Sequence, residues 1–145
     1  MKRYAFVLAL LALPACPTEG VEDFRFFDRD RYENEVQPIL AASCANPSCH
    51  GRPDRPFSLF GTRAWRENPD DVFLPTQLTD AEIEHNYTQS CAFAATGDSP
   101  ESAQLLLKPL EQYAGTYHGG GVIFEGTAEE DYRVILDWVE EGWDQ

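Results

Sequence analysis

Two thiols and an imidazole lie together between residues 44 and 50, in the stretch Cys-Ala-Asn-Pro-Ser-Cys-His. Each of the thiols of Cys44 and Cys49 can add across one vinyl group of a haem, and the adjacent His50 can bind the iron from one face. Four residues separate the cysteines here instead of two, so the loop between them must bulge. These residues predict covalent haem attachment at Cys44 and Cys49, with His50 as the proximal iron ligand.

The N-terminus has the pattern of an export signal. Lys2 and Arg3 give it a positive start, an apolar run follows over residues 5–13, and Leu-Pro-Ala-Cys at residues 13–16 forms a small-residue cleavage site. The run is shorter than the ~20 residues that a bilayer-spanning helix needs. The pattern resembles the lipoprotein box of bacterial lipoproteins, which implies that Cys16 becomes the lipidated first residue. An ordinary signal peptide cut nearby is the alternative, and both predict a protein outside the cytoplasm. With lipid on Cys16 the predicted location is the cell envelope, anchored to a membrane on its periplasmic or exterior face.

The cysteine count leaves several chemistries open. If Cys16 carries lipid, Cys44, Cys49 and Cys91 remain, an odd number in an oxidising compartment. A disulfide that involves Cys44 or Cys49 leaves one thiol over, and so does haem attachment. A zinc site needs four ligands at recognisable spacing, and the sequence has no second close pair. The immediate His50 favours haem, because a structural disulfide has no need of it.

Length and charge limit the organisation and the partners. We expect a signal peptide at 1–15, a tether rich in proline, glycine and acidic residues at 16–28, and one domain with a single core at 29–145. The net charge of −14 becomes −16 when Lys2 and Arg3 leave with the signal. Such a surface disfavours nucleic acid, which is bound mainly by basic side chains, and favours a partner protein with a basic surface. The alternative reading of the acidity is solubility alone.

The N-terminal half of the domain is expected to hold two helices. The first has Asp30 as its cap, is kinked or restarted at Pro38, and ends at Cys44, so that it delivers the attachment loop. Thr79 and Glu82 form a capping box that starts the second. One face of this second helix is expected to carry Ile83, Tyr87 and Cys91. Between the two helices we expect an irregular wrapping loop over residues 51–67.

Two more helices are expected in the C-terminal half. Ser99 and the proline after it open a short helix that Pro109 stops. A second capping box at Thr127 begins an amphipathic helix that continues to Trp143, with Gly142 as an interruption near its end. No alternation typical of strands lasts more than a few residues. The predicted fold class is all-α, with four short helices and long loops.

Several segments resemble the c-type cytochrome domains of secreted bacterial proteins. The attachment motif with its flanks, Val-Gln-Pro-Ile-Leu at 36–40 and Gly51, is similar to a spaced variant of their haem site. Leu-Leu-Leu-Lys-Pro-Leu at 105–110, His-Gly-Gly-Gly at 118–121 and the final helix are similar to their C-terminal half. The resemblance covers residues 30–142. It implies a cytochrome c-like fold around one haem c.

The second axial ligand of the iron has one main candidate. The only methionine is Met1, which leaves with the signal, so a methionine sulfur is excluded. His118 follows His50 by 68 residues on a glycine-rich loop and is the candidate ligand. The alternative is a loop histidine bonded to backbone, with water or nothing on the iron. His85 lies off the apolar stripe of its helix and is expected at the surface.

These features predict an electron carrier. Two imidazoles should give the iron a lower potential than histidine with methionine, which suits electron relay. The sequence therefore predicts a c-type haem-binding lipoprotein that transfers electrons at the cell envelope. Arg52 or Arg55 is a candidate partner of a haem propionate, and the alternative is that both arginines are solvated beside a small satellite core. The alternative is a haem-free, disulfide-stabilised envelope lipoprotein that binds other proteins. An enzyme such as a peroxidase is a third hypothesis, disfavoured because no acid–base pair is evident beside the expected iron.

Overall fold

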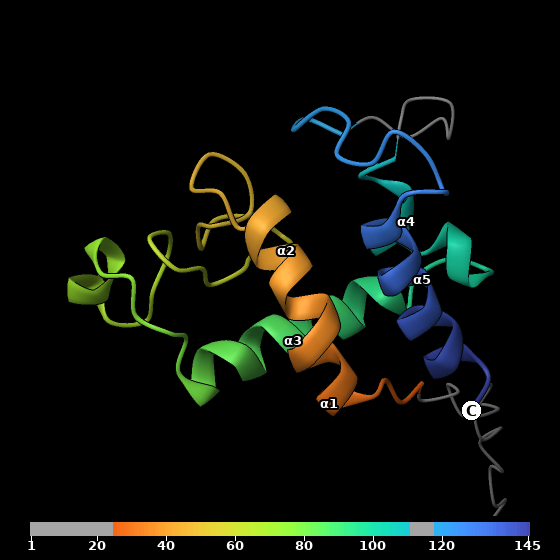
Figure 1. The fold of residues 1–145 in the computed structure, drawn as a ribbon, viewed down its shortest axis with the longest axis horizontal. Helices are drawn as coiled ribbons and strands as arrows, with labels where there is room; N and C mark the ends of the chain where they lie inside the picture. The colour runs from red at the N-terminus through yellow and green to blue at the C-terminus, as the bar shows by residue number, and fades with distance from the viewer. Residues whose placement is uncertain (1–24, 111–117) are drawn as a thin grey trace, which may run out of the picture.

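Figure 1 shows a computed structural model of the chain, which describes residues 25–110 and 118–145. The predicted signal peptide, Cys16 and most of the tether lie outside these residues. Within them the structure is helical and has no strand, only an isolated bridge between Leu110 and Phe124. The all-α prediction is confirmed. None of the described helices is long and apolar enough to span a bilayer.

One helical rod forms the N-terminal part of the domain. It runs without a break through α1 (Arg29–Arg31), the π-helical turn η1 (Tyr32–Val36) and α2 (Gln37–Ser43). Its cap is Asp28, whose side chain accepts a hydrogen bond from the N–H of Arg31, so the predicted cap Asp30 is wrong and lies in the first turn. Pro38 does not break the rod. The π turn ends just before it, so the proline lies in the first turn of α2, where a missing N–H is tolerated. Cys44 is the C-cap, as predicted.

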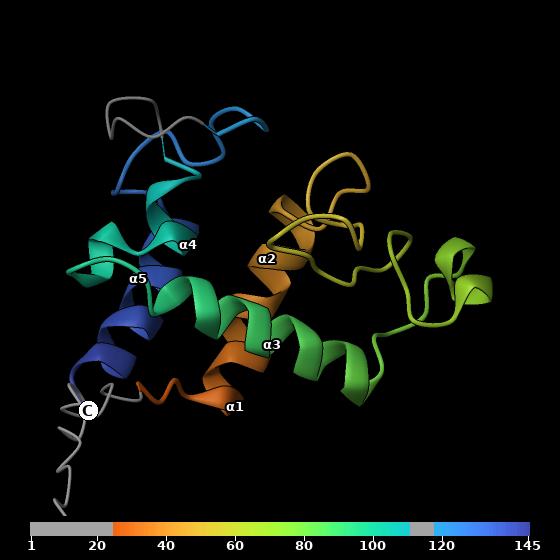
Figure 2. The ribbon, with the colours of Figure 1, turned by 180° about the vertical axis from the view of Figure 1, so that it is seen from behind.

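Helix α3 (Asp80–Ala94) crosses the rod, as the two opposite views show (Figures 1 and 2). The capping box of Thr79 and Glu82 is confirmed: the N–H of Thr79 donates to the Glu82 carboxylate at 2.9 Å, and the N–H of Glu82 to the Thr79 hydroxyl at 3.3 Å. The expected apolar stripe is only half-buried. The fully buried face is instead mostly polar and consists of Glu82, Asn86, Ser90 and Ala94.

Each polar side chain on that face has a partner. Glu82 accepts two hydrogen bonds from the guanidinium of Arg66, both at 2.9 Å. Asn86 accepts from the N–H of Phe60 at 2.7 Å and donates to its carbonyl at 2.9 Å. The hydroxyl of Ser90 lies 3.1 Å from that of Tyr32. A polar stripe is therefore compatible with burial, because its hydrogen bonds to water are replaced within the protein.

The connections are irregular and include three short helical turns. These are the 3₁₀ turns η2 (Pro69–Phe73) and η3 (Pro100–Ser102), and the single-turn helix α4 (Gln104–Leu107). One continuous helix from Ser99 to Pro109 was expected, and this is wrong: Ala103 is extended, with ψ 136°, and separates η3 from α4. The hydroxyl of Thr96 accepts a hydrogen bond from the N–H of Gln104 at 2.7 Å and so begins α4 anew. The irregular loop over residues 51–67 is confirmed.

Helix α5 (Glu130–Trp143) closes the domain and is amphipathic, as predicted. It begins two residues later than the Thr127 capping box implied, with Glu129 in place of Thr127 at its N-cap. Gly142 does not interrupt it. The glycine is required because a Cβ at this position would lie 2.2 Å from the ring of Phe27, which packs there.

An aromatic cluster joins these elements into one core. The ring centroid of Trp138 lies 4.9 Å from that of Phe27 and 5.4 Å from that of Tyr32. Its indole N–H donates to the carbonyl of Asp28 at 2.8 Å. Tyr32 in turn contacts Tyr87 of α3, with centroids 5.3 Å apart. The rod, α3 and α5 are thus held together at a single point.

Replacing Glu82 with Gln should destabilise the protein strongly. Burial disfavours the charged form of Glu82, but hydrogen bonds from Arg66 and from two backbone N–H groups prevail and lower its pKa to about 2. Both side chains of the pair are 1% exposed. Leaving Arg66 without its partner should lower the free energy of unfolding at pH 7 by about 3–5 kcal/mol, measured by urea denaturation. Because the pKa of Glu82 is lowered on folding, its carboxylate stabilises the folded protein above pH 4.5, and this contribution is lost as the pH falls towards 2. The difference in the free energy of unfolding between wild type and Glu82→Gln should therefore shrink over that range.

The matched control is Asp54→Asn, which breaks the exposed pair between Arg52 and Asp54. Solvent screens that pair, so the loss should stay below about 1 kcal/mol. Equal losses for the two variants, or a Glu82→Gln effect that does not change with pH, would contradict the role given to the buried pair.

Candidate functional site

The loop after the rod brings Cys44 and His50 together despite the long spacer. The N–H of His50 donates to the carbonyl of Cys44 at 3.2 Å, which closes the loop. The N–H of Cys49 donates to the carbonyl of Asn46 at 2.8 Å, so residues 46–49 form a β-turn with Pro47 at its second position. Proline is favoured at that position because its φ angle is already suitable. The extra residues are taken up in this turn and leave the cysteines and the histidine adjacent.

Two glycines pack the loop against the domain. A Cβ on Gly51 would lie 2.1 Å from the carbonyl oxygen of Ala45. A Cβ on Gly61 would lie 2.9 Å from the Cβ of Ala45, which is itself 3% exposed. The loop between Cys44 and His50 is therefore packed so closely around Ala45 that neither glycine position has room for a side chain.

His50 is fixed by a neighbouring segment. Its Nδ1 lies 2.8 Å from the carbonyl oxygen of Phe57, and its own carbonyl accepts the N–H of Leu59 at 2.8 Å. Burial, aided by the nearby His118 and Arg55, lowers the pKa of His50. The imidazole is thus neutral at pH 7. Because a carbonyl can only accept, the proton is on Nδ1 and the lone pair is on Nε2, as metal ligation requires.

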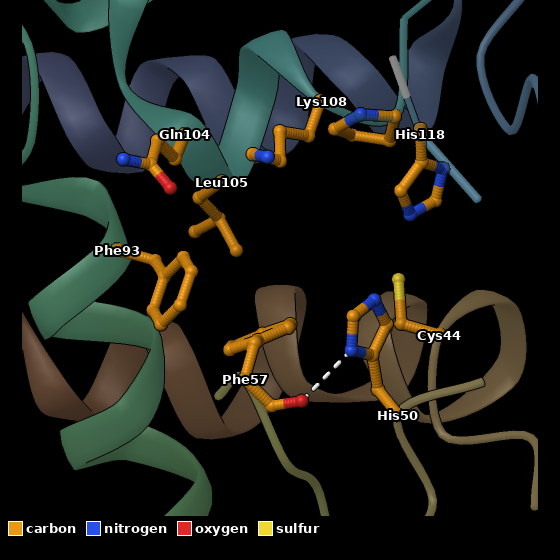
Figure 3. Close-up of a pocket in the computed structure, with 9 residues that line it drawn as sticks. Cys44, His50, Phe57, Phe93, Gln104, Leu105, Lys108 and His118 are labelled. Carbon is orange, nitrogen blue, oxygen red and sulfur yellow. Dashed lines mark hydrogen bonds between the residues drawn. The ribbon is translucent and has the colours of Figure 1, made fainter. Parts of the chain in front are cut away.

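His118 faces His50 from the opposite side of a pocket (Figure 3). Its Nδ1 lies 2.7 Å from the carbonyl oxygen of Gly121, and the N–H of Gly121 donates back to the carbonyl of His118 at 3.0 Å. Gly121 has φ 81°, a left-handed conformation that favours glycine. The two imidazole centroids are 6.0 Å apart and their planes differ by 13°. Both predicted ligands therefore present Nε2 to the same space.

This separation matches two imidazoles on one metal ion. An imidazole nitrogen binds a metal at about 2.0–2.1 Å, and the ring centroid lies about 1 Å farther back, so opposed ligands have centroids about 6 Å apart. In each ring the other nitrogen contacts a backbone carbonyl, the arrangement that orients metal-binding histidines. The pair formed by His50 and His118 is suited to axial coordination.

The space around the pair is apolar on one side and polar on the other. A cavity of about 50 Å³ is lined by Phe57, Phe93 and Leu105, together with Cys44 and both histidines. A more open cleft of about 460 Å³ adjoins it, lined by Cys49, Arg55 and again both histidines. Since they share the two rings, the cavity and the cleft form one slot. A thiol lies on each part of it.

The three described cysteines are free thiols. Burial raises the pKa of Cys44 to about 12 and that of Cys91 to about 11. Cys91 lines neither the cavity nor the cleft and packs beside the core next to Tyr87. The disulfide predicted as the alternative is therefore not formed among residues 25–110 and 118–145.

The donor set fits a haem better than a bare metal ion. In the part of the chain that the structure describes, no group of three or more His, Cys, Asp or Glu side chains is placed to hold a metal. Two histidines are too few for a structural zinc site, which needs four protein ligands. They suffice for a metal whose other ligands come from a porphyrin. The opposed imidazoles, apolar walls and two thiols fit that group.

No protein family, curated protein or solved structure matches this chain.

Other residues predicted near the site lie differently. His85 is half-buried and not at the surface as predicted: its Nε2 lies 3.0 Å from the carbonyl oxygen of Ser58. Arg52 pairs with Asp54 on the surface. Arg55 lines the cleft, where its side chain donates to the carbonyl of Cys49 at 3.1 Å. Of the two arginines predicted to contact a propionate, only Arg55 lines the slot.

Sequence reasoning missed Phe93, Gln104 and Lys108 as lining residues of the cavity. The sequence gives no indication that Phe93 and Gln104 line the cavity. They lie near His50 only because α3 crosses the rod and the chain then turns into α4. Lys108 does stand out in the sequence, because it is the only lysine of the chain besides Lys2.

Gly51→Ala should disturb the attachment loop. Its Cβ would meet the backbone of Ala45, which cannot move without opening the loop. We expect the free energy of unfolding to fall by about 1–3 kcal/mol. Gly126→Ala is the control, since a Cβ there meets nothing within 4 Å, and should be neutral or stabilising by up to about 1 kcal/mol. Similar denaturation midpoints for the two variants would contradict the packing described for the loop.

Proposed function

We propose that this chain is a c-type haem protein of the cell envelope that carries electrons. The observation that supports this most is the pair of opposed imidazoles, with centroids 6.0 Å apart and each Nδ1 on a carbonyl. We further propose that the helical domain has a cytochrome c-like arrangement. In this arrangement His50 and His118 are the axial ligands, and Cys44 and Cys49 hold the porphyrin covalently.

The attachment needs no oxidant. In each thioether the thiol S–H adds across a vinyl C=C: a C–S bond forms and the hydrogen moves to the other vinyl carbon. Cys44 is suited to this because it is a free thiol, and its raised pKa keeps it protonated and resistant to disulfide exchange.

The chain's own groups define what the site would do. A bound haem supplies a one-electron redox centre. His50 and His118 would both hold the iron of such a haem, which would favour electron relay over binding of a substrate at the metal. The absence of a sulfur ligand keeps the potential lower than in histidine–methionine sites. Phe57, Phe93 and Leu105 exclude water from one side of the slot.

The proposed setting follows from the sequence. We propose that Cys16 carries lipid and attaches the domain to a membrane of the envelope. The net charge of −14 favours a redox partner with a basic surface and disfavours nucleic acid. Association with such a partner should weaken as salt screens the opposing charges.

The first test is colour. Exported from a host with haem-maturation genes, the protein should absorb in the Soret region, keep its haem through denaturing electrophoresis, and show a mass increased by one haem. Replacing both Cys44 and Cys49 with Ser should abolish covalent retention, because no thioether can form. Cys91→Ser is the matched control and should retain it. Colourless wild-type protein whose Cys44 and Cys49 are oxidised would instead support a haem-free, disulfide-stabilised lipoprotein.

The second test addresses the distal ligand. His118→Ala should keep the covalent haem and lose the low-spin spectrum typical of two imidazoles, whereas His118→Met should raise the reduction potential. His85→Ala is the control, since that ring lies on Ser58 and outside the slot, and its spectrum should match the wild type. An unchanged spectrum in His118→Ala would rule out His118 as the ligand.

A further inference from the structure

Lys108 lines the apolar cavity. It is the C-cap of α4 and borders the space between His50 and His118. Within residues 25–110 and 118–145, no carboxylate lies within ion-pair distance of its ammonium group. Lys108 is half-buried at the edge of this cavity, so an anionic group of a bound ligand could reach its ammonium group.

Basic residues are scarce in this chain, which has 25 acidic and 11 basic side chains. Four of the described basic side chains form an ion pair with a described carboxylate. Arg29, Arg31 and Arg66 each pair with at least one glutamate, and Arg52 pairs with Asp54. Two of the basic side chains outside these pairs border the slot: Arg55 lines its polar cleft, and Lys108 lines its apolar cavity.

A second donor accompanies Lys108. Gln104 lies one helical turn earlier, where its carbonyl accepts the N–H of Lys108 at 3.3 Å, and its side chain lines the same cavity. Figure 3 shows both side chains on the same rim, across the pocket from Cys44. An ammonium and an amide N–H₂ together can donate to both oxygens of one carboxylate.

We propose that Lys108, assisted by Gln104, binds a propionate carboxylate of the haem. This inference rests on the proposed function. A haem carries its two propionates on the edge opposite its vinyl groups. The thiols of Cys44 and Cys49 fix the vinyl edge, so the propionates extend away from Cys44, towards the rim that carries the two donors.

A comparison of haemin with its dimethyl ester, which lacks the propionate charges, tests the contact. The full chain with Cys44→Ser and Cys49→Ser is titrated with each. Haemin should bind roughly tenfold more tightly than the ester, a difference of about 1.4 kcal/mol, because the ester loses one charge-assisted contact. Lys108→Gln should bring that ratio close to one, and Lys108→Arg should largely retain it. Arg52→Gln is the matched control for loss of a positive charge outside the cavity and should leave the ratio unchanged.

The covalently loaded protein gives an independent measurement. Lys108→Gln removes a positive charge near the metal and should lower the reduction potential more than Arg52→Gln does, with the low-spin spectrum retained. This measurement decides the matter if the serine variant binds neither compound. An unchanged ratio or potential overturns the proposal, and so does a changed axial-ligand spectrum, which would make Lys108 an iron ligand. Each of these leaves the haem protein intact, whereas colourless protein in every variant refutes the proposed function itself.

Discussion

The contact of Trp138 with the start of the domain is the constraint on which the remaining structure depends. Its ring packs against Phe27 and Tyr32, and its N–H is satisfied by the carbonyl of Asp28. This contact fixes α5 against the rod. The C-terminal end of the rod leads directly into Cys44 and His50. An indole that does not line the slot therefore helps to decide where the loop between Cys44 and His50 lies.

The two histidines of the site have unequal support. His50 is held by Phe57 and Leu59, residues of a different segment. His118 is held by Gly121, three residues away in its own turn, and a Cβ added at Gly119 or Gly121 would meet no atom within 4 Å. One ring is thus positioned by tertiary packing and the other mainly by local geometry. A change of charge at the slot would be accommodated more easily on the His118 side than on the side of His50.

Local signals were predictable from the sequence and distant partners were not. The box of Thr79 and Glu82 was read correctly because both hydrogen bonds join residues three apart. The burial of Glu82 itself was missed, since it depends on Arg66, which lies 16 residues earlier. The break at Ala103 was missed for a similar reason, because a hydroxyl from outside the turn restarts the helix. Residue types at the attachment site could be identified, whereas their alignment with His118 required the fold.

His50 and His118 also enclose a long stretch of chain, because 68 positions separate them. Joining both to one ion would close a loop of that length, and polymer theory assigns to such a closure a loss of unfolded-state entropy worth about 4 kcal/mol. In the proposed function, the two imidazoles that set the redox potential would also cross-link the two ends of this segment. Loss of either histidine as a ligand would then lower the melting temperature as well as change the absorption spectrum.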